Sequence, residues 1–162
     1  MTERVFVALG ANLGDRRAQL DEAVRRLGEL EGTTVLAVAP AIQTKAMLPP
    51  DDLTPQPDYL NTVAELRTTL EPLPLLRALK AIERAMGRVT TVRWAARLID
   101  LDLVLFGARL LHTDELTIPH PGLASRRFVL EPLLQLWPGA VDPQTGGALA
   151  AADVLLRAAS TS

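Results

Sequence analysis

The hydrophobic and polar positions of this chain follow the two periods that distinguish strands from helices. Residues 5–9 are all apolar and Gly10 ends the run, so we predict a central strand that is followed by a turn. Asp15 can cap the next segment, in which apolar residues recur at helical spacing, so 16–30 is predicted to be an amphipathic helix. Residues 33–41 are β-branched and apolar, which indicates a second strand.

Prolines interrupt the pattern over residues 43–58, which we predict to be a long loop. Three aspartates keep this segment polar: Asp51, Asp52 and Asp58. Loops of this length inside a compact domain are usually functional lids or disordered segments. We expect the loop to be a mobile lid.

A strand, a helix and another strand are predicted after the loop. Polar and apolar residues alternate over 60–69, which is typical of a strand that is covered on one face. Pro72 suits a helix start, a buried stripe follows at helical spacing, and Gly87 is placed for a left-handed C-terminal cap. The apolar run over 97–106 is predicted to be the last strand of the series.

The order of these elements is strand, helix, strand, strand, helix, strand. This βαββαβ pattern indicates an α+β fold, a ferredoxin-like sandwich in which helices cover one face of an antiparallel sheet. A hairpin or extended segment should follow Gly107, and 128–136 has a helical pattern that forms a C-terminal helical extension, whereas the Ala-rich tail from Val141 is uninformative. We expect one catalytic domain over residues 1–162.

The last strand of this series carries two acids inside its apolar run, Asp100 and Asp102. Side chains alternate across a strand, so both acids leave the same face, about 7 Å apart. Two such carboxylates repel each other unless a cation lies between them, and Mg²⁺ takes oxygen ligands. The alternative is an amphipathic strand with Leu101, Leu103 and Leu105 inward and the acids merely solvated.

Arginines crowd the segment before these acids, at Arg84, Arg88, Arg93 and Arg97. Guanidinium groups suit phosphate oxygens, so acids for a metal stand beside bases for phosphate. This combination indicates an enzyme that acts on nucleotide phosphates. The connection from Arg88 to Arg97 lacks a helix or strand period; it is either a solvated loop or, as we favour, a clamp that closes on phosphates.

Three further positions could contact an anion. His120 lies between two prolines, in a rigid segment, where it could contact phosphate or be structural. Arg126 and Arg127 open the next helix, and one of them could reach an anion while the other is exposed.

Tyr59, Asn61 and Phe128 form a second group of candidates. An amide two residues from a ring could bind the edge of a flat heterocycle whose faces are held by rings. Core packing is the alternative for any aromatic residue.

The composition narrows the classes of function. A net charge of −2 disfavours a nucleic-acid surface, and the absence of cysteine excludes disulfides, thiol nucleophiles and thiolate metal sites. The apolar run at 5–9 is too short for a signal peptide, and no stretch of 18 apolar residues occurs, so we expect a cytoplasmic protein without membrane partners. Walker and dinucleotide glycine motifs are absent. The oligomeric state stays open.

Five groups of residues, in order from about Val5 to Leu134, resemble one family. They are Gly10-Ala11-Asn12-Leu13-Gly14-Asp15, Gln56-Pro57-Asp58-Tyr59-Leu60-Asn61, Arg93-Trp94 through Arg97 to Asp100-Leu101-Asp102 with Leu105-Phe106-Gly107, Thr117-Ile118-Pro119-His120-Pro121, and Arg126 with Phe128. The chain resembles the 6-hydroxymethyl-7,8-dihydropterin pyrophosphokinases of folate biosynthesis.

This resemblance implies transfer of a diphosphate from ATP to the hydroxymethyl group of the pterin, with release of AMP. Two Mg²⁺ ions would be held by Asp100 and Asp102. The pterin would contact Thr44, Tyr59, Asn61 and Phe128. Arg88 and Arg97 would be catalytic, and the ATP-binding residues would be Glu83, Trp94, His120 and Arg126.

The chain departs from the usual family pattern at several places. The loop from Arg88 to Trp94 is a residue shorter, with Thr90 and Thr91 where a lysine is common, and Glu115 and Lys80 replace a usual arginine and a glutamine-like residue. Residues 45–48 intervene between Thr44 and the next prolines, and Ala95-Ala96 replace a usual Gly-Pro. Two other functions stay open beside the pyrophosphokinase. One is a ferredoxin-like module that binds a nucleotide or metabolite without turnover, and the other is a Mg²⁺-dependent transferase that uses ATP with a different acceptor.

Overall fold

The structure is a computed structural model that describes residues 3–12, 14–44, 58–87 and 99–160. In these ranges the main sheet is formed by β1 (Glu3–Ala11), β2 (Thr33–Val38), β3 (Ile42–Thr44), β4 (Tyr59–Thr68) and β5 (Asp100–Phe106). The helices are α1 (Arg16–Gly28), α2 (Pro72–Gly87), α3 (Arg127–Leu136) and α4 (Leu149–Ser160). A small hairpin of β6 (Leu111–His112) and β7 (Thr117–Ile118) precedes a 3-10 turn, η1 (Leu123–Ser125).

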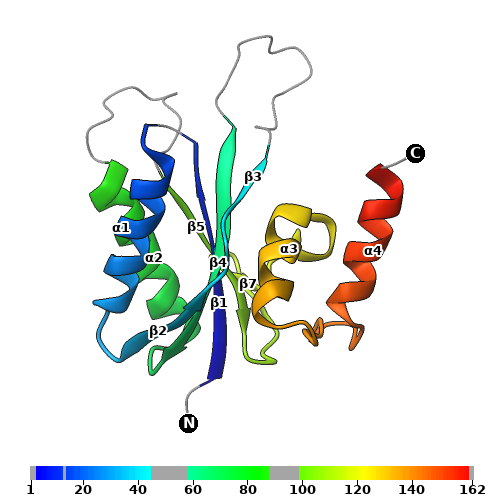
Figure 1. Cartoon of the computed structure of the whole chain (residues 1–162). Coiled ribbons are helices and arrows are strands. Elements are labelled where there is room, and N and C mark those ends of the chain that lie inside the picture. The colour runs from blue at the N-terminus through cyan, green and yellow to red at the C-terminus, as the bar shows by residue number, and fades with distance from the viewer. Residues whose placement is uncertain (1–2, 13, 45–57, 88–98, 161–162) are drawn as a thin grey trace.

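The strands of the main sheet lie in the order β2-β4-β1-β5, with β3 also paired to β4, and all these pairs are antiparallel. Helices α1 and α2 cover one face of the sheet, while α3 and α4 lie on the other side (Figure 1). The predicted ferredoxin-like βαββαβ arrangement is therefore confirmed. The C-terminal extension adds a helical layer to the second face.

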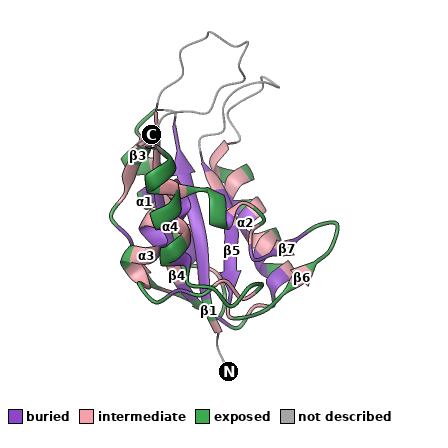
Figure 2. Cartoon of the chain, turned by 90° about the vertical axis from the view of Figure 1, so that its right-hand side faces the viewer, coloured by how far each residue is buried: buried purple, intermediate pink, exposed green. Residues whose placement is uncertain are grey.

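Strand β1 is buried on both of its faces, which explains the uninterrupted apolar run in the sequence. Val5, Val7 and Leu9 pack in a core with α1 and α2, whereas Phe6 and Ala8 pack in a second core with α3. Figure 2 shows the buried central strands between helices whose outer surfaces are exposed. The sheet is thus the shared wall of two hydrophobic cores.

Several boundaries differ from the sequence-based expectation; α1, for example, ends at Gly28 rather than at residue 30. Gly10 lies inside β1 rather than in a turn, and Gly87 is the last residue of α2 without a left-handed backbone. The strand expected over 33–41 ends at Val38, since Pro40 has no N–H to donate to a ladder, and the next strand, β3, begins only at Ile42. The loop expected over 43–58 begins later, since β3 continues through Thr44, and residues 45–57 lie outside the described ranges, as does the lid prediction.

An irregular register in β5 separates leucines that simple alternation places together. Leu105 is opposite Phe6 but Leu103 is opposite Val7, so one extra residue stands between them on β5. Leu101 and Leu103 consequently join the core under α1 and α2, whereas Leu105 joins the core under α3. The alternative of one inward row of three leucines is therefore wrong.

The hairpin after Gly107 and the helix expected over 128–136 are both present, as β6-β7 and α3. The segment from Val141, for which the sequence predicted no structure, contains α4, and Leu149 of this helix is buried in the second core. None of the helices in the described ranges has both the length and the apolar character needed to cross a bilayer.

Replacing either of two glycines near the α1–β2 connection with alanine should change the free energy of unfolding in different ways. Gly32 has a φ of +68°, and a Cβ there would collide with Thr69 Oγ1, whereas a Cβ on Gly28 would meet only Val35 Cγ2, at 3.9 Å. We expect Gly32→Ala to lower the free energy of unfolding by about 1 kcal/mol or more, and Gly28→Ala to leave it equal or slightly higher. Urea denaturation of both variants measures this, and equal losses would contradict the assigned backbone.

Candidate active site

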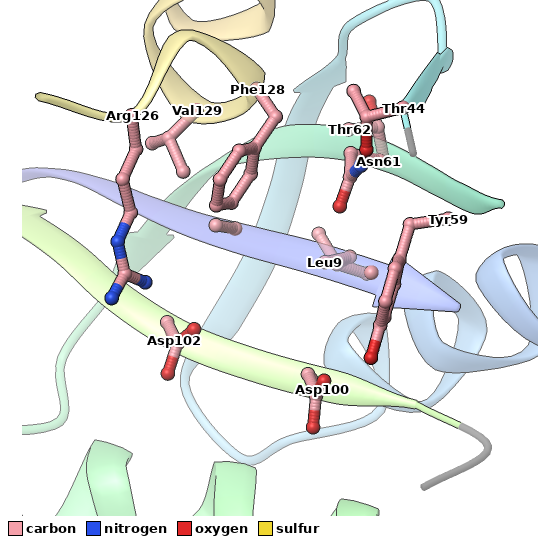
Figure 3. A pocket seen from close by; sticks show the side chains of 12 residues that line it. Leu9, Thr44, Tyr59, Asn61, Thr62, Asp100, Asp102, Arg126, Phe128 and Val129 are labelled. Carbon is pink, nitrogen blue, oxygen red and sulfur yellow. Dashed lines mark hydrogen bonds between the residues drawn. The ribbon is translucent and has the colours of Figure 1, made fainter. Parts of the chain in front are cut away.

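A pocket opens on the α3 side of the sheet, between the start of α3 and the ends of β1, β4 and β5 (Figure 3). Strand residues and the first residues of α3 form its wall together. The lining residues are Ala8, Leu9, Gly10, Thr44, Tyr59, Asn61, Thr62, Asp100, Asp102, Arg126, Phe128 and Val129. Seven of the twelve residues predicted for the site are in this group: Thr44, Tyr59, Asn61, Asp100, Asp102, Arg126 and Phe128.

Asp100 and Asp102 come from β5, which is the edge strand beside β1. Their register partners on β1 are Gly10 and Ala8, and both carboxylates point into the pocket (Figure 3). The acids therefore share one face of the sheet, as the alternation predicts. Within the described ranges, no hydrogen bond or ion pair engages the Asp102 carboxylate, so it is available to a ligand.

Asn61 lies across β1 from these acids. Its Nδ2 donates to Thr44 Oγ1 at 2.6 Å, which links β4 to β3. Its Oδ1 lies over Gly10, where an added Cβ would be only 2.9 Å from that oxygen. Gly10 is thus the close approach that lets the Asn61 amide face the pocket, a use typical of glycine inside a strand.

Tyr59 forms the wall beside Asp100, and its hydroxyl points toward that carboxylate (Figure 3). Partial burial raises the pKa of the Tyr59 phenol, and the negative charge of Asp100 raises it further, so the phenol keeps its proton near neutral pH. The preceding residue is anchored twice: Arg16 Nη1 donates to Asp58 O at 2.6 Å, and Gln43 Nε2 donates to Asp58 Oδ2 at 2.9 Å. These bonds position the start of β4.

The two arginines that open α3 have different surroundings. Arg126 points across the pocket toward Asp102, and its guanidinium carbon lies 5.8 Å from the centre of the Phe128 ring (Figure 3). Arg127 instead pairs with Glu131, at 3.4 Å, and with the buried Asp153 of α4, at 3.6 Å. Of the two candidates, Arg126 is therefore the one that faces the pocket.

His120 is not among the residues that line the pocket, but it is near enough to Asp102 and Arg126 for both charges to affect its pKa. Its Nδ1 accepts a hydrogen bond from the Gly122 N–H at 3.0 Å, so the neutral ring carries its proton on Nε2. Burial lowers the pKa of His120, the Asp102 charge raises it, and the Arg126 charge lowers it. A neutral imidazole that donates through Nε2 is the form expected at neutral pH.

Glu83, which the resemblance assigns to ATP, is on α2 and outside the pocket wall. Its Oε2 accepts from the Leu101 N–H at 2.8 Å, and its Oε1 lies 3.2 Å from Lys80 Nζ. Leu101 stands between Asp100 and Asp102, so Glu83 holds the backbone that carries both acids.

Arg88, Arg93, Trp94 and Arg97 lie outside the described residues, and with them the predicted arginine clamp. Their roles stay predictions from the sequence.

Sequence reasoning missed several lining residues, among them Gly10, Thr62 and Val129. Gly10 carried a usable signal, because a glycine directly after an apolar run can mark close backbone contact as well as a turn. The sequence gives no comparable signal at Val129, because the position of this residue depends on how α3 packs on the sheet.

The surroundings of His120 predict opposite effects from two variants. Asp102→Asn removes the charge that raises the His120 pKa, so this pKa should fall further below its ordinary value of 6.5. Arg126→Gln removes a charge that lowers it, so the pKa should rise. An NMR pH titration of the His120 ring in both variants measures the shifts, and shifts of the same sign would contradict this geometry.

Comparison with known proteins places the chain among relatives of one kind. A family model described as 7,8-dihydro-6-hydroxymethylpterin-pyrophosphokinase matches residues 6–138. A 2-amino-4-hydroxy-6-hydroxymethyldihydropteridine pyrophosphokinase of Pseudomonas aeruginosa is 44% identical over 138 residues, which cover 85% of this chain and 83% of that protein. The folic acid synthesis protein fol1 of Schizosaccharomyces pombe is 42% identical over 140 residues, which cover 86% of this chain but only 19% of that protein.

A solved structure supports the fold. The structure described as HPPK-DHPS in complex with substrates has a TM-score of 0.71 at 14% identity, and the match covers 96% of this chain and 43% of that one. The chain therefore spans less than half of this larger protein and about a fifth of the fission yeast one. Its own sequence, matched over most of its length, belongs to the 7,8-dihydro-6-hydroxymethylpterin-pyrophosphokinase family.

Proposed function

We propose that this chain transfers a diphosphate from ATP to the hydroxymethyl group of 6-hydroxymethyl-7,8-dihydropterin and releases AMP, as a step of folate biosynthesis. The observation that carries the proposal is one pocket with an amide and two rings on one side and two carboxylates on the other. The name of the 44% identical Pseudomonas aeruginosa relative describes the same activity.

The pterin would occupy the part of the pocket around Asn61. A pterin is a flat heterocycle whose edge presents donors and acceptors, and an amide can bind such an edge with both of its polar atoms. Tyr59 and Phe128 stand where aromatic rings would contact its faces (Figure 3). Thr44, already bonded to Asn61, fixes the amide in one orientation.

Asp100 and Asp102 would hold two Mg²⁺ ions. The described residues contain no group of three or more potential metal ligands, so a site made of protein groups alone is not expected from them. Mg²⁺ bound with a nucleotide commonly takes one or two carboxylates, with phosphate oxygens and water as the remaining ligands. Two pocket-facing carboxylates fit this pattern, and the bound ions would neutralise charge on the triphosphate.

The phosphates would extend along Asp102 toward Arg126. Arg126 supplies a positive charge at that end, and His120 can donate from Nε2 to a phosphate oxygen. By the family resemblance, Arg88 and Arg97 would act on the transferring group and Trp94 would help to enclose ATP. Glu83 would support ATP binding through the backbone of β5, which it holds at Leu101.

The reaction itself requires positioning more than covalent chemistry. The new bond joins the hydroxymethyl oxygen to the β-phosphorus of ATP. The bond that breaks joins the β-phosphorus to the oxygen that bridges to the α-phosphate, so this oxygen leaves with AMP. The rings and the amide would hold the pterin so that its hydroxymethyl oxygen approaches the β-phosphorus in line.

We also propose that residues 1–162 act as one catalytic unit in the cytoplasm, where ATP is available, with small molecules as substrates and neither nucleic acid nor membrane as partner. One sheet serves both hydrophobic cores and carries most of the pocket, which supports a single unit.

Product analysis tests the proposed function. The protein is mixed with ATP and Mg²⁺, with and without the hydroxymethyl-dihydropterin, and AMP is measured. AMP that forms only with the pterin and only with the metal supports the proposal. ATP hydrolysis that ignores the pterin would favour a transferase with another acceptor, and tight binding without product would favour a binding module.

Asp100→Asn should lower turnover by orders of magnitude while the protein stays folded, because the variant removes a metal ligand and also relieves like-charge repulsion. The same variant should lower the pKa of Tyr59, since the Asp100 charge raises it. Asp114→Asn is the matched control, because Asp114 is an exposed residue of the β6-β7 connection. Near-normal turnover in Asp100→Asn would remove the metal role.

Gly10→Ala should raise the KM for the pterin about tenfold with a smaller effect on kcat, because the new methyl would displace Asn61 Oδ1. Gly139→Ala is the control, since its Cβ would have only an ordinary contact, 3.9 Å from Trp137 Nε1. Steady-state kinetics with varied pterin measures the difference, and an unchanged KM in Gly10→Ala would show that Asn61 does not bind this substrate.

A further inference from the structure

Asn12 belongs to a sequence motif to which the proposed function assigns no role. It follows Ala11, the last residue of β1, and its side chain is 1% exposed. Within the described residues, neither its Nδ2 nor its Oδ1 has a hydrogen-bond partner. A buried amide without partners lowers stability, because it gives up its bonds to water and gains none.

Each of the other buried polar residues of the described ranges has at least one side-chain hydrogen bond, although Asp153 Oδ1 has none. Thr33 Oγ1 and Thr68 Oγ1 bond each other at 2.8 Å, and Thr62 Oγ1 donates to Ala39 O at 2.6 Å. Asn61 bonds Thr44, and Asp153 accepts from Arg157 at 2.9 Å. Asn12 is therefore the single residue of this group whose whole polar end is unsatisfied.

The position of Asn12 connects it with the pocket. It stands two residues beyond Gly10, which is paired with Asn61 on one side and with Asp100 on the other. Asn12 itself is not among the residues that line the pocket, so we assign it no direct contact with a ligand. A side-chain amide offers a donor and an acceptor side by side, which matches the N–H and C=O groups of the backbone.

We propose that Asn12 is a positioning residue of the substrate-loaded state, in which its amide binds backbone peptide groups, whereas it reaches no partner among the described residues of this structure. The substrate-free state carries the cost of the unpaired amide, and the loaded state is relieved of it. This difference in free energy shifts the protein toward the loaded arrangement when substrates bind. The identity of those substrates rests on the proposed function.

Asn12→Leu separates this role from a purely structural one. Leucine has nearly the same shape as asparagine, and Asn12 does not have a positive φ, so the backbone accepts the change. The substrate-free variant should melt about 3 °C higher than the wild type, since it loses an unsatisfied polar group. Its kcat/KM should nevertheless fall about tenfold, because the loaded state loses the hydrogen bonds that the amide makes there.

Ligand-induced stabilisation provides a readout that does not depend on turnover. Melting temperatures are measured without ligand, with Mg²⁺ and α,β-methylene ATP, with the hydroxymethyl-dihydropterin, and with both. The shift caused by ligand should be smaller in Asn12→Leu than in the wild type, and the arm that shows the difference identifies the substrate that completes the Asn12 contacts. Asn12→Ala is a second variant that should reduce the ligand-induced shift as well.

Thr33→Val is the matched control, because it also replaces a buried polar group with an apolar one of similar shape. Thr33 has a partner and lies at the opposite end of the sheet, beside Thr68. This variant should melt lower than the wild type, with an unchanged ligand-induced shift and unchanged kcat/KM.

Three results would overturn the inference. They are a lower melting temperature in substrate-free Asn12→Leu, a ligand-induced shift equal to that of the wild type, and a wild type that neither ligand stabilises. If the wild type binds the ligands but forms no AMP, the proposed function fails, and the melting shifts still decide the role of Asn12.

Discussion

The pairing of β1 with a strand on each side is the constraint on which the rest of the structure depends. Because β1 is apolar on both faces, it takes the centre of the sheet, and its register with β4 and β5 places Asn61, Gly10 and Asp100 in one row. Gly10, the middle residue of this row, has no side chain. A flat ligand can therefore lie over β1, with an amide on one side and a carboxylate on the other.

Hydrogen bonds from neighbouring residues hold the residues of the pocket wall in place. Glu83 binds the backbone of β5 at Leu101, between the two acids, and Thr44 binds the amide of Asn61. Arg16 and Gln43 bind Asp58, which precedes Tyr59. None of these hydrogen bonds has to break during the proposed reaction. The residues that would position the substrates are therefore largely preorganised.

The sequence predicted what depends on local periodicity and missed what depends on contacts between distant segments. The alternation in β5 correctly placed Asp100 and Asp102 on one face, since this needs only the period of a strand. It did not reveal the extra residue between Leu103 and Leu105, because a bulge is set by the register with β1. The α4 segment was also missed, since its Ala-rich pattern gains meaning only when Leu149 packs on α3.

The choice between Arg126 and Arg127 also depends on a distant residue, because Asp153 on α4 draws Arg127 away from the pocket. Asp153 lies beyond residues 6–138, which are the part of the chain that the family model matches. A protein shortened to that matched part would keep every described residue of the pocket wall, but Arg127 would lose Asp153 and keep only Glu131 as a partner. The contacts that hold Arg127 away from the pocket therefore extend beyond the part of the chain that defines the family.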